Sequence, residues 1–178
     1  MKKKILIFGL GSIGVKHANL LLKFKKIPEI LFFSRRKNKK FNSTINIEEI
    51  VKFNPDYILV CSKTFQHFQD IKLIEKNFKN KIVLVEKPLF HKSIKLSLKK
   101  NKYYVGYNLR FHPVIKFLKN KLKKKEIFSV SILCNSFLPR WRNNIDYFNS
   151  YSSSKEKGGG VLLDLSHEID YLEWIFGR

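Results

Sequence analysis

The sequence predicts an α/β fold in which a doubly wound parallel sheet is followed by the beginning of an α+β region. Two observations predict this fold class. Over residues 1–106, short apolar segments alternate with segments whose apolar residues recur at helical spacing, as in a parallel sheet with crossover helices. The short segments are apolar at consecutive positions, which is typical of strands covered on both faces. Beyond residue 106 the alternation ends, so we expect one domain over 1–106 and a second, incomplete domain over 107–178.

The first domain opens with the apolar run 5–8, which is rich in strand-forming residues and ends at a glycine. Apolar residues at helical spacing then predict a helix over 13–24. Further strands are predicted over 29–33, 57–61, 81–85 and 103–105, and further helices over 47–53 and 64–77. Asn54-Pro55-Asp56 predicts a turn before the strand 57–61.

The second domain follows a different pattern. We predict a lysine-rich helix over 114–124, a polar loop over 135–157 and an apolar helix over 161–176 that begins after three glycines. Between the first helix and the loop, apolar and polar residues alternate over 128–133, which predicts a strand with one exposed face.

The net charge of +22, from 36 Lys and Arg against 14 Asp and Glu, raises the alternative of a basic protein that binds nucleic acid or an anionic surface. Only six of these basic residues are arginine, and lysine is spread over the whole chain. No recognition-helix pattern, aromatic-basic stacking motif or zinc spacing accompanies the charge. We therefore expect no nucleic-acid partner and look for function in a site.

Cys61 and Cys134 are too few for a disulfide framework and lack metal-ligand spacing, so no metal site is expected. Both lie in apolar segments, which predicts buried, reduced thiols. The lysines at 2–4 and the apolar run after them imitate a signal peptide, but glycines interrupt the run and no cleavage site follows. No apolar stretch reaches the length of about eighteen residues that suggests a membrane span. The expectation is a cytoplasmic protein without a membrane partner.

Residues 9–14, Gly-Leu-Gly-Ser-Ile-Gly, form a G-x-G-x-x-G motif between the first predicted strand and the first predicted helix. In this context Gly9 permits a tight turn, Gly11 lets the backbone approach a pyrophosphate, and Gly14 lets helix and strand pack closely. The start of the helix, at Ser12 and Ile13, offers N–H groups and a positive dipole end. The motif predicts a Rossmann-type dinucleotide-binding domain.

The end of the second predicted strand bears on the choice of dinucleotide. NAD sites usually carry Asp or Glu about twenty residues beyond the glycines. Here that position is Ser34, followed by Arg35 and Arg36. One hydroxyl and two guanidinium groups suit a 2′-phosphate, so we expect NADP(H) to be favoured over NAD(H). The alternative is that both arginines belong to the solvated basic run 35–40.

Three residues are candidates for the chemistry. Lys87 follows the predicted strand 81–85, so it lies at the edge of the sheet where ligands bind; the alternative is one more surface lysine. Asp164 and His167 are three residues apart in the predicted helix 161–176, which would place them on one helix face. His167 could exchange a proton with a substrate hydroxyl, or be an internal histidine satisfied by a backbone carbonyl.

Together these segments resemble the Gfo/Idh/MocA family of nicotinamide-dependent oxidoreductases. The resemblance runs from the glycine loop through Glu86-Lys87-Pro88 and Val105-Gly106-Tyr107 to the segment GGGVLLDLSHEID over 158–170, and so covers nearly the whole chain. It implies that Lys87 hydrogen-bonds the reacting oxygen, that His167 is the general acid/base, and that Asp164 orients the substrate or His167. It also implies a cis Lys87-Pro88 bond.

The resemblance implies a wider set of ligand contacts. Cofactor-binding residues beyond the glycine loop and residues 34–36 are expected after the strand 57–61 and in the E-K-P motif: Cys61, Ser62, Thr64, His67, Glu86 and Lys87. His67 could equally be a plain surface histidine. Substrate-binding residues are expected at the start of the second domain, before the three glycines and in the last helix: Tyr107, Arg110, Trp141, Asp164 and His167.

Two features depart from the family pattern. Many members space the Asp and His four residues apart, whereas Asp164 and His167 are three apart. Members also continue well past the last helix, whereas Arg178 ends this sequence. Trp141, Asp146-Tyr147 and Tyr151 before the glycines resemble one subgroup of the family. Because enzymes of that subgroup act in sugar metabolism, the resemblance implies a sugar or nucleotide-sugar substrate.

We therefore expect an NAD(P)-dependent oxidoreductase that transfers hydride between nicotinamide and a carbinol or carbonyl carbon of a sugar-like substrate. The alternative is an inactive dinucleotide-binding remnant that lacks a complete substrate domain. A homo-oligomer stays open.

Overall fold

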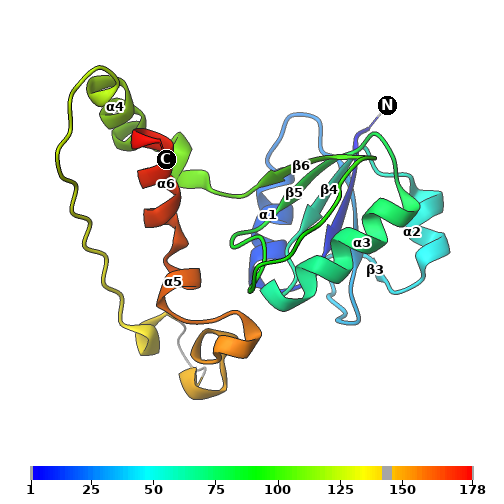
Figure 1. The fold of residues 1–178 in the computed structure, drawn as a ribbon. Helices are drawn as coiled ribbons and strands as arrows, with labels where there is room; N and C mark the ends of the chain where they lie inside the picture. Colours follow the sequence, from blue (N-terminus) through cyan, green and yellow to red (C-terminus); the bar gives the residue numbers. More distant parts are fainter. Residues whose placement is uncertain (1, 142–145, 178) are drawn as a thin grey trace. The chain divides into compact units, whose positions relative to one another are not determined.

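The computed structural model describes residues 2–141 and 146–177. The chain divides into two compact units, residues 1–106 and 107–178, which we describe separately (Figure 1). None of the described helices is long and apolar enough to cross a membrane.

The first unit contains one six-stranded sheet whose paired strands all run parallel. Its strands are β1 (Lys4–Phe8), β2 (Glu29–Phe33), β3 (Ser43–Thr44), β4 (Tyr57–Val60), β5 (Ile82–Val85) and β6 (Lys102–Val105). Their spatial order is β3-β2-β1-β4-β5-β6. The chain builds the sheet outward from β1 to β3, returns to place β4 on the other side of β1, and continues outward to β6. This order is that of a doubly wound dinucleotide-binding sheet and confirms the predicted fold class. Only the two-residue β3 has no predicted counterpart.

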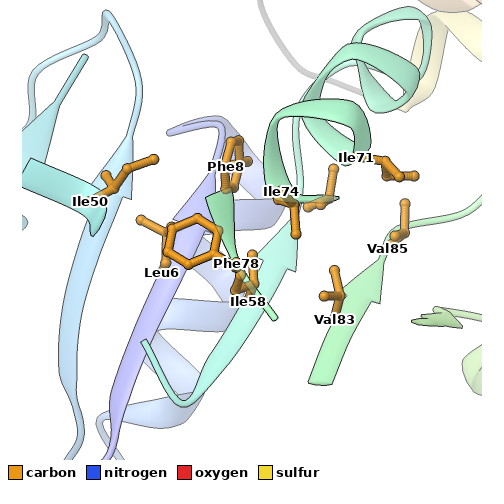
Figure 2. Packing of buried hydrophobic residues seen from close by; sticks show 10 residues of the cluster. Leu6, Phe8, Ile50, Ile58, Ile71, Ile74, Phe78, Val83 and Val85 are labelled. Carbon is orange, nitrogen blue, oxygen red and sulfur yellow. The ribbon is translucent and has the colours of Figure 1, made fainter. Parts of the chain in front are cut away.

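Helices cover both faces of this sheet because neighbouring residues of each strand point in opposite directions. On one face, Ala18 of α1 (Ser12–Leu21) packs in a cluster with Ile5 and Ile7 of β1. On the other face, α2 (Ile47–Phe53) and α3 (His67–Asn77) cover Leu6 and Phe8 of the same strand (Figures 1 and 2). Figure 2 shows the second cluster, which includes Ile50, Ile58, Ile71, Ile74, Phe78, Val83 and Val85.

The connection from β5 to β6, residues 86–101, contains no helix although all its residues are described. Instead, four of its apolar side chains pack against the cluster under α3: Leu89, Phe90, Leu96 and Leu98. Glu75 of α3 accepts hydrogen bonds from the backbone N–H groups of Lys99 and Lys100 at the far end of the connection. The segment that carries the E-K-P motif is therefore held by side-chain anchors.

In the described residues of the second unit, the regular structure is helical. It comprises η2 (Asn108–Phe111), α4 (Pro113–Leu122), four short 3₁₀ turns over 138–157, α5 (Val161–Asp164) and α6 (Ser166–Phe176). Helices α4 and α6 are joined by Lys119, whose ammonium lies 4.0 Å from the centre of the Trp174 ring and also donates to the Trp174 carbonyl.

Two predictions of secondary structure in this unit are wrong. Residues 128–133 pair with no strand in the described part of the chain, and Phe128 and Leu133 are 90% and 87% exposed. Alternation alone makes no strand, because a strand needs a hydrogen-bonding neighbour. The predicted helix 161–176 is broken at Leu165 (φ −103°, ψ 30°), so Asp164 and His167 lie in different helices.

The prediction for the two cysteines is confirmed for one of them. Cys61 is buried at the end of β4, whereas Cys134 is exposed. The burial prediction for Cys134 is wrong because the segment around it has no sheet to pack against. Among the described residues, no cluster of His, Cys, Asp and Glu could hold a metal ion.

Candidate active site

The glycine loop connects β1 to α1, and each glycine has a distinct environment. Gly9 has a φ of +92°, and a Cβ on it would lie 2.7 Å from the Cα of Ser62. A Cβ on Gly14 would lie 2.2 Å from the Gly9 carbonyl oxygen. A Cβ on Gly11 would meet no described atom within 4 Å. Gly9 and Gly14 are thus required by packing, while Gly11, with Ser12 and Ile13 beside it, leaves open space at the start of α1.

The loop after β2 carries the residues predicted to read the 2′ position. Ser34 accepts a hydrogen bond from the Arg36 backbone N–H through its hydroxyl (3.1 Å), and its own N–H donates to the Thr44 carbonyl (2.9 Å). Arg35 and Arg36 are exposed. The turn at Ser34 therefore leaves both guanidinium groups on the solvent side of the strand end.

The segment after β4 lies against the glycine loop. The Cys61 N–H donates to the Phe8 carbonyl, and burial together with the nearby Glu86 carboxylate raises the pKa of Cys61. The Ser62 hydroxyl donates to Asp70 Oδ2 at 2.5 Å. Burial raises the pKa of Asp70 to about 6, although the hydrogen bond from Ser62 acts in the opposite direction. Thr64 is buried in the 3₁₀ turn η1 (Thr64–Gln66).

His67, the first residue of α3, joins this segment to the E-K-P motif. Its ring is 1% exposed; Nδ1 lies 3.2 Å from the Pro88 carbonyl oxygen and 3.1 Å from that of Leu89, and Nε2 lies 3.2 Å from that of Ser62. Burial lowers the pKa of His67 despite these carbonyls, so the neutral ring has one N–H to donate among them. The alternative of a surface histidine is wrong, and the side chain contacts protein backbone.

The E-K-P motif follows β5 directly. The Glu86 N–H donates to the Val60 carbonyl (2.9 Å), and its Oε1 lies 2.6 Å from Nε2 of His17 on α1. Lys87 is half-buried, and the Lys87-Pro88 bond is cis, which confirms that expectation. Glycine loop, β4 end and E-K-P motif thus meet at one edge of the parallel sheet, where ligands of such sheets bind.

In the second unit, the rings of Tyr107 and His167 meet edge to face, with centres 5.7 Å apart and planes at 82°. Asp164 bonds within its own segment: Oδ2 accepts from the Gly160 N–H (3.2 Å) and Oδ1 from the Ser152 hydroxyl (3.4 Å). This carboxylate therefore fixes the start of α5.

The two other predicted substrate residues also have protein partners. Arg110 donates through Nε and one terminal nitrogen to both oxygens of Asp170 (2.8 and 2.5 Å), and this contact raises the pKa of Arg110. The Trp141 indole N–H donates to the Ser136 hydroxyl at 2.5 Å, and the Trp141 side chain is 39% exposed. Of the neighbouring motif residues, Asp146 caps the turn η4 (Tyr147–Asn149), and the side chain of Tyr151 lies outside the described residues.

Sequence reasoning missed His17 and Asp70, which contact the predicted site residues Glu86 and Ser62. His17 lies three residues after Gly14, one turn into α1, and Asp70 lies in the first turn of α3. A polar residue in the first two turns of a helix that begins at the carboxyl end of a strand is the signal that could have pointed to both.

Comparison with known proteins agrees with this geometry. The model of the Gfo/Idh/MocA oxidoreductase family, NAD-binding Rossmann fold, matches residues 3–98. The uncharacterized oxidoreductase YrbE of Bacillus subtilis is 28% identical over an alignment of 197 positions, which covers 99% of this chain and 55% of YrbE.

Two solved structures share the fold. The WlbA dehydrogenase of Thermus thermophilus, in complex with NAD and UDP-GlcNAcA, is 18% identical with a TM-score of 0.72, over 99% of this chain and 64% of that one. The scyllo-inositol dehydrogenase of Lactobacillus casei, with bound NAD(H) and scyllo-inositol, is 20% identical with a TM-score of 0.68, over 99% of this chain and 57% of that one.

This chain therefore spans 55–64% of the length of these three proteins. The family model matches more than half of the 178 residues, including the glycine loop and the E-K-P motif. The chain belongs to the Gfo/Idh/MocA oxidoreductase family, and its first unit is the NAD-binding Rossmann fold of that family.

Proposed function

We propose that this chain is the nucleotide-binding and reacting part of an NAD(P)-dependent oxidoreductase. Its reaction would transfer hydride between C4 of the nicotinamide and a carbinol or carbonyl carbon of a sugar-like substrate. The observation that carries the proposal is the open start of α1 at Gly11, at the same sheet edge as Glu86-Lys87-Pro88. Gly9 and Gly14 close the loop against protein atoms, whereas Gly11 leaves room for a pyrophosphate at the positive end of α1.

The residues present suit a dinucleotide, and when bound its nicotinamide supplies the hydride acceptor or donor. In the oxidation direction, Lys87 would hydrogen-bond the substrate oxygen and stabilise the charge that develops on it. His167 would accept the hydroxyl proton as the hydride leaves the carbon, and would return it in the reduction direction. The edge contact from Tyr107 fixes the plane of the His167 ring. Asp164 would orient His167 or the substrate through the start of α5.

The proposed substrate class follows from the two solved relatives. UDP-GlcNAcA and scyllo-inositol both present ring carbons that carry hydroxyl groups, and they are the ligands of WlbA and of the scyllo-inositol dehydrogenase. We extend to this chain only the shared chemistry, a secondary alcohol on a polyhydroxylated ring. Tyr107, Arg110 and Trp141 are the further side chains proposed to contact it.

The test begins with NADH and NADPH titrations of the 178-residue chain, in which binding is measured through the fluorescence of the dinucleotide. We expect saturable binding, and turnover of NAD(P)+ with UDP-GlcNAcA or scyllo-inositol. Lys87→Ala should lower kcat by about a hundredfold or more while the dinucleotide Kd changes by less than about threefold. Lys92→Ala, an exposed lysine of the same connection, is the matched control and should change neither. Absence of saturable binding would refute the proposal, and binding without turnover would favour the remnant alternative.

We further propose that the site favours NADP(H). No carboxylate occupies the end of β2; Ser34 stands there, and Arg35 and Arg36 are exposed beside it. Arg35→Ala and Arg36→Ala should each weaken NADPH binding about tenfold, the effect of losing one guanidinium–phosphate contact, and leave NADH within about twofold. Lys39→Ala, an exposed lysine of the same run, tests for a general charge effect. Equal losses for NADPH and NADH would refute the preference.

A further inference from the structure

His17 is not among the residues proposed to bind the dinucleotide, yet its side chain contacts one of them, Glu86. Its Nε2 lies 2.6 Å from Oε1 of Glu86, and the two side chains are 28% and 23% exposed. The residues are 69 positions apart, so this contact is a tertiary link. A hydrogen bond of this length to a carboxylate, partly shielded from water, restricts both side chains.

The contact joins the two parts of the sheet edge that bind ligand in the proposed function. His17 lies one turn beyond Gly14, on the helix whose start faces the proposed pyrophosphate position. Glu86 directly precedes Lys87, and its backbone is fixed by the bond from its N–H to the Val60 carbonyl. Because the backbone of Glu86 is held, its remaining conformational freedom lies in the side-chain torsions, which the contact with His17 restricts.

We propose that His17 is a positioning residue that holds the Glu86 carboxylate toward the bound dinucleotide and thereby couples helix α1 to the E-K-P motif. His17 holds Oε1 of Glu86, and in this proposal the other carboxylate oxygen would accept a hydrogen bond from the dinucleotide. Fixing this rotamer before binding removes an ordering cost from association, so His17 strengthens dinucleotide binding without touching the dinucleotide. The inference rests on the proposed dinucleotide site.

A double-mutant cycle on NADH affinity tests the coupling. The four proteins are the wild-type chain, His17→Ala, Glu86→Ala and the double variant, titrated with NADH by fluorescence at a temperature where all are folded by circular dichroism. We expect His17→Ala to weaken NADH binding about 5- to 30-fold, which lies within the range of coupling between residues in direct contact. If His17 acts through Glu86, the double variant should bind no more weakly than Glu86→Ala alone.

Two further variants separate positioning from a general effect on the helix. His17→Gln places an amide nitrogen where Nε2 now donates, so it should restore the Kd to within about threefold of the wild type. Lys16→Ala, the exposed neighbour on α1, should leave the Kd unchanged. A purely structural role of His17 would show as a lower melting temperature with an unchanged Kd for the folded protein, and that result would overturn the inference.

The outcomes distinguish this inference from the proposed function. A wild-type chain that binds NADH, combined with additive losses from His17→Ala and Glu86→Ala, would refute the coupling and leave the proposed function standing. A wild-type chain that shows no saturable binding of either NADH or NADPH would refute the proposed function and the coupling with it.

Discussion

Asp70→Asn should make the first unit more stable at neutral pH. Burial raises the pKa of Asp70 from 3.8 to about 6, so the folded chain holds this proton at pH values where the unfolded chain has lost it. The stability that Asp70 contributes is therefore fully present below about pH 4 and is lost as the pH rises through about 6. Asparagine has the same shape, stays neutral throughout, and can still accept the Ser62 hydrogen bond through its amide oxygen.

The difference in pKa, converted at about 1.4 kcal/mol per pH unit, corresponds to about 3 kcal/mol. Asp70 is only partly shielded from solvent, so we expect about 2 kcal/mol between wild type and variant above pH 7. Urea denaturation followed by far-UV circular dichroism from pH 3.5 to 8 measures it. Tryptophan fluorescence is unsuitable, because Trp141 and Trp174 both lie in the second unit.

Asp56→Asn is the matched control with the opposite sign. The Lys4 backbone N–H lowers the pKa of Asp56, so this carboxylate contributes stability above its unfolded pKa that is lost as the pH falls. Its variant should be less stable than wild type at pH 7 and similar to it in acid. A difference between wild type and Asp70→Asn that stays constant from pH 4 to 7 would refute the reasoning.

Substitutions at four further positions test the contacts within each unit. Gly14→Ala should destabilise the first unit by about 3 kcal/mol in urea denaturation, because its Cβ would lie 2.2 Å from a carbonyl oxygen. Gly11→Ala should lower the stability by less than about 1 kcal/mol and still weaken NADH binding. Equal destabilisation by the two glycine variants would contradict the loop geometry. Ile74→Ala removes a fully buried side chain and should cost about 2–5 kcal/mol by the same method, while Ile74→Val should cost about 1 kcal/mol. Asp170→Asn removes the negative charge and one of the two oxygens that accept from Arg110, so it should lower the stability of the second unit by about 1–3 kcal/mol, measured by tryptophan fluorescence. No change would show that the contact is not stabilising.

The first unit could be predicted from the sequence because its signals are local. The run 5–8, the glycine loop and the helix after it are adjacent in the chain, and their order alone indicates a strand, a turn and a helix. The partners that fix the site are not local. His17 contacts Glu86 across 69 positions, and the three carbonyl groups around His67 come from two different connections. Neither contact has a periodic pattern that a single sequence could display.

The second unit was less predictable because its elements depend on neighbours. The alternation over 128–133 predicts a strand, but the described residues offer it no partner strand. The apolar run 161–176 predicts one helix, but the backbone of Leu165 leaves the helical region and divides it. Spacing along a helix then no longer fixes how Asp164 and His167 face each other, and their proposed roles rest on the family pattern.

The different exposure of the two cysteines allows thiol labelling to measure local opening of the first unit. Cys134 is exposed, so a thiol reagent reaches it directly, although the nearby Glu168 also raises the pKa of this thiol. Cys61 is buried, which raises its pKa and keeps reagents from it until the surrounding structure opens. In a Cys134→Ser background, the slow labelling of Cys61 would then measure how often the edge formed by β4 and the glycine loop separates. A dinucleotide bound at that edge should slow the labelling in proportion to its occupancy. Because the Cys61 thiol has no proposed catalytic role, its labelling rate would report ligand binding without turnover and without a known substrate.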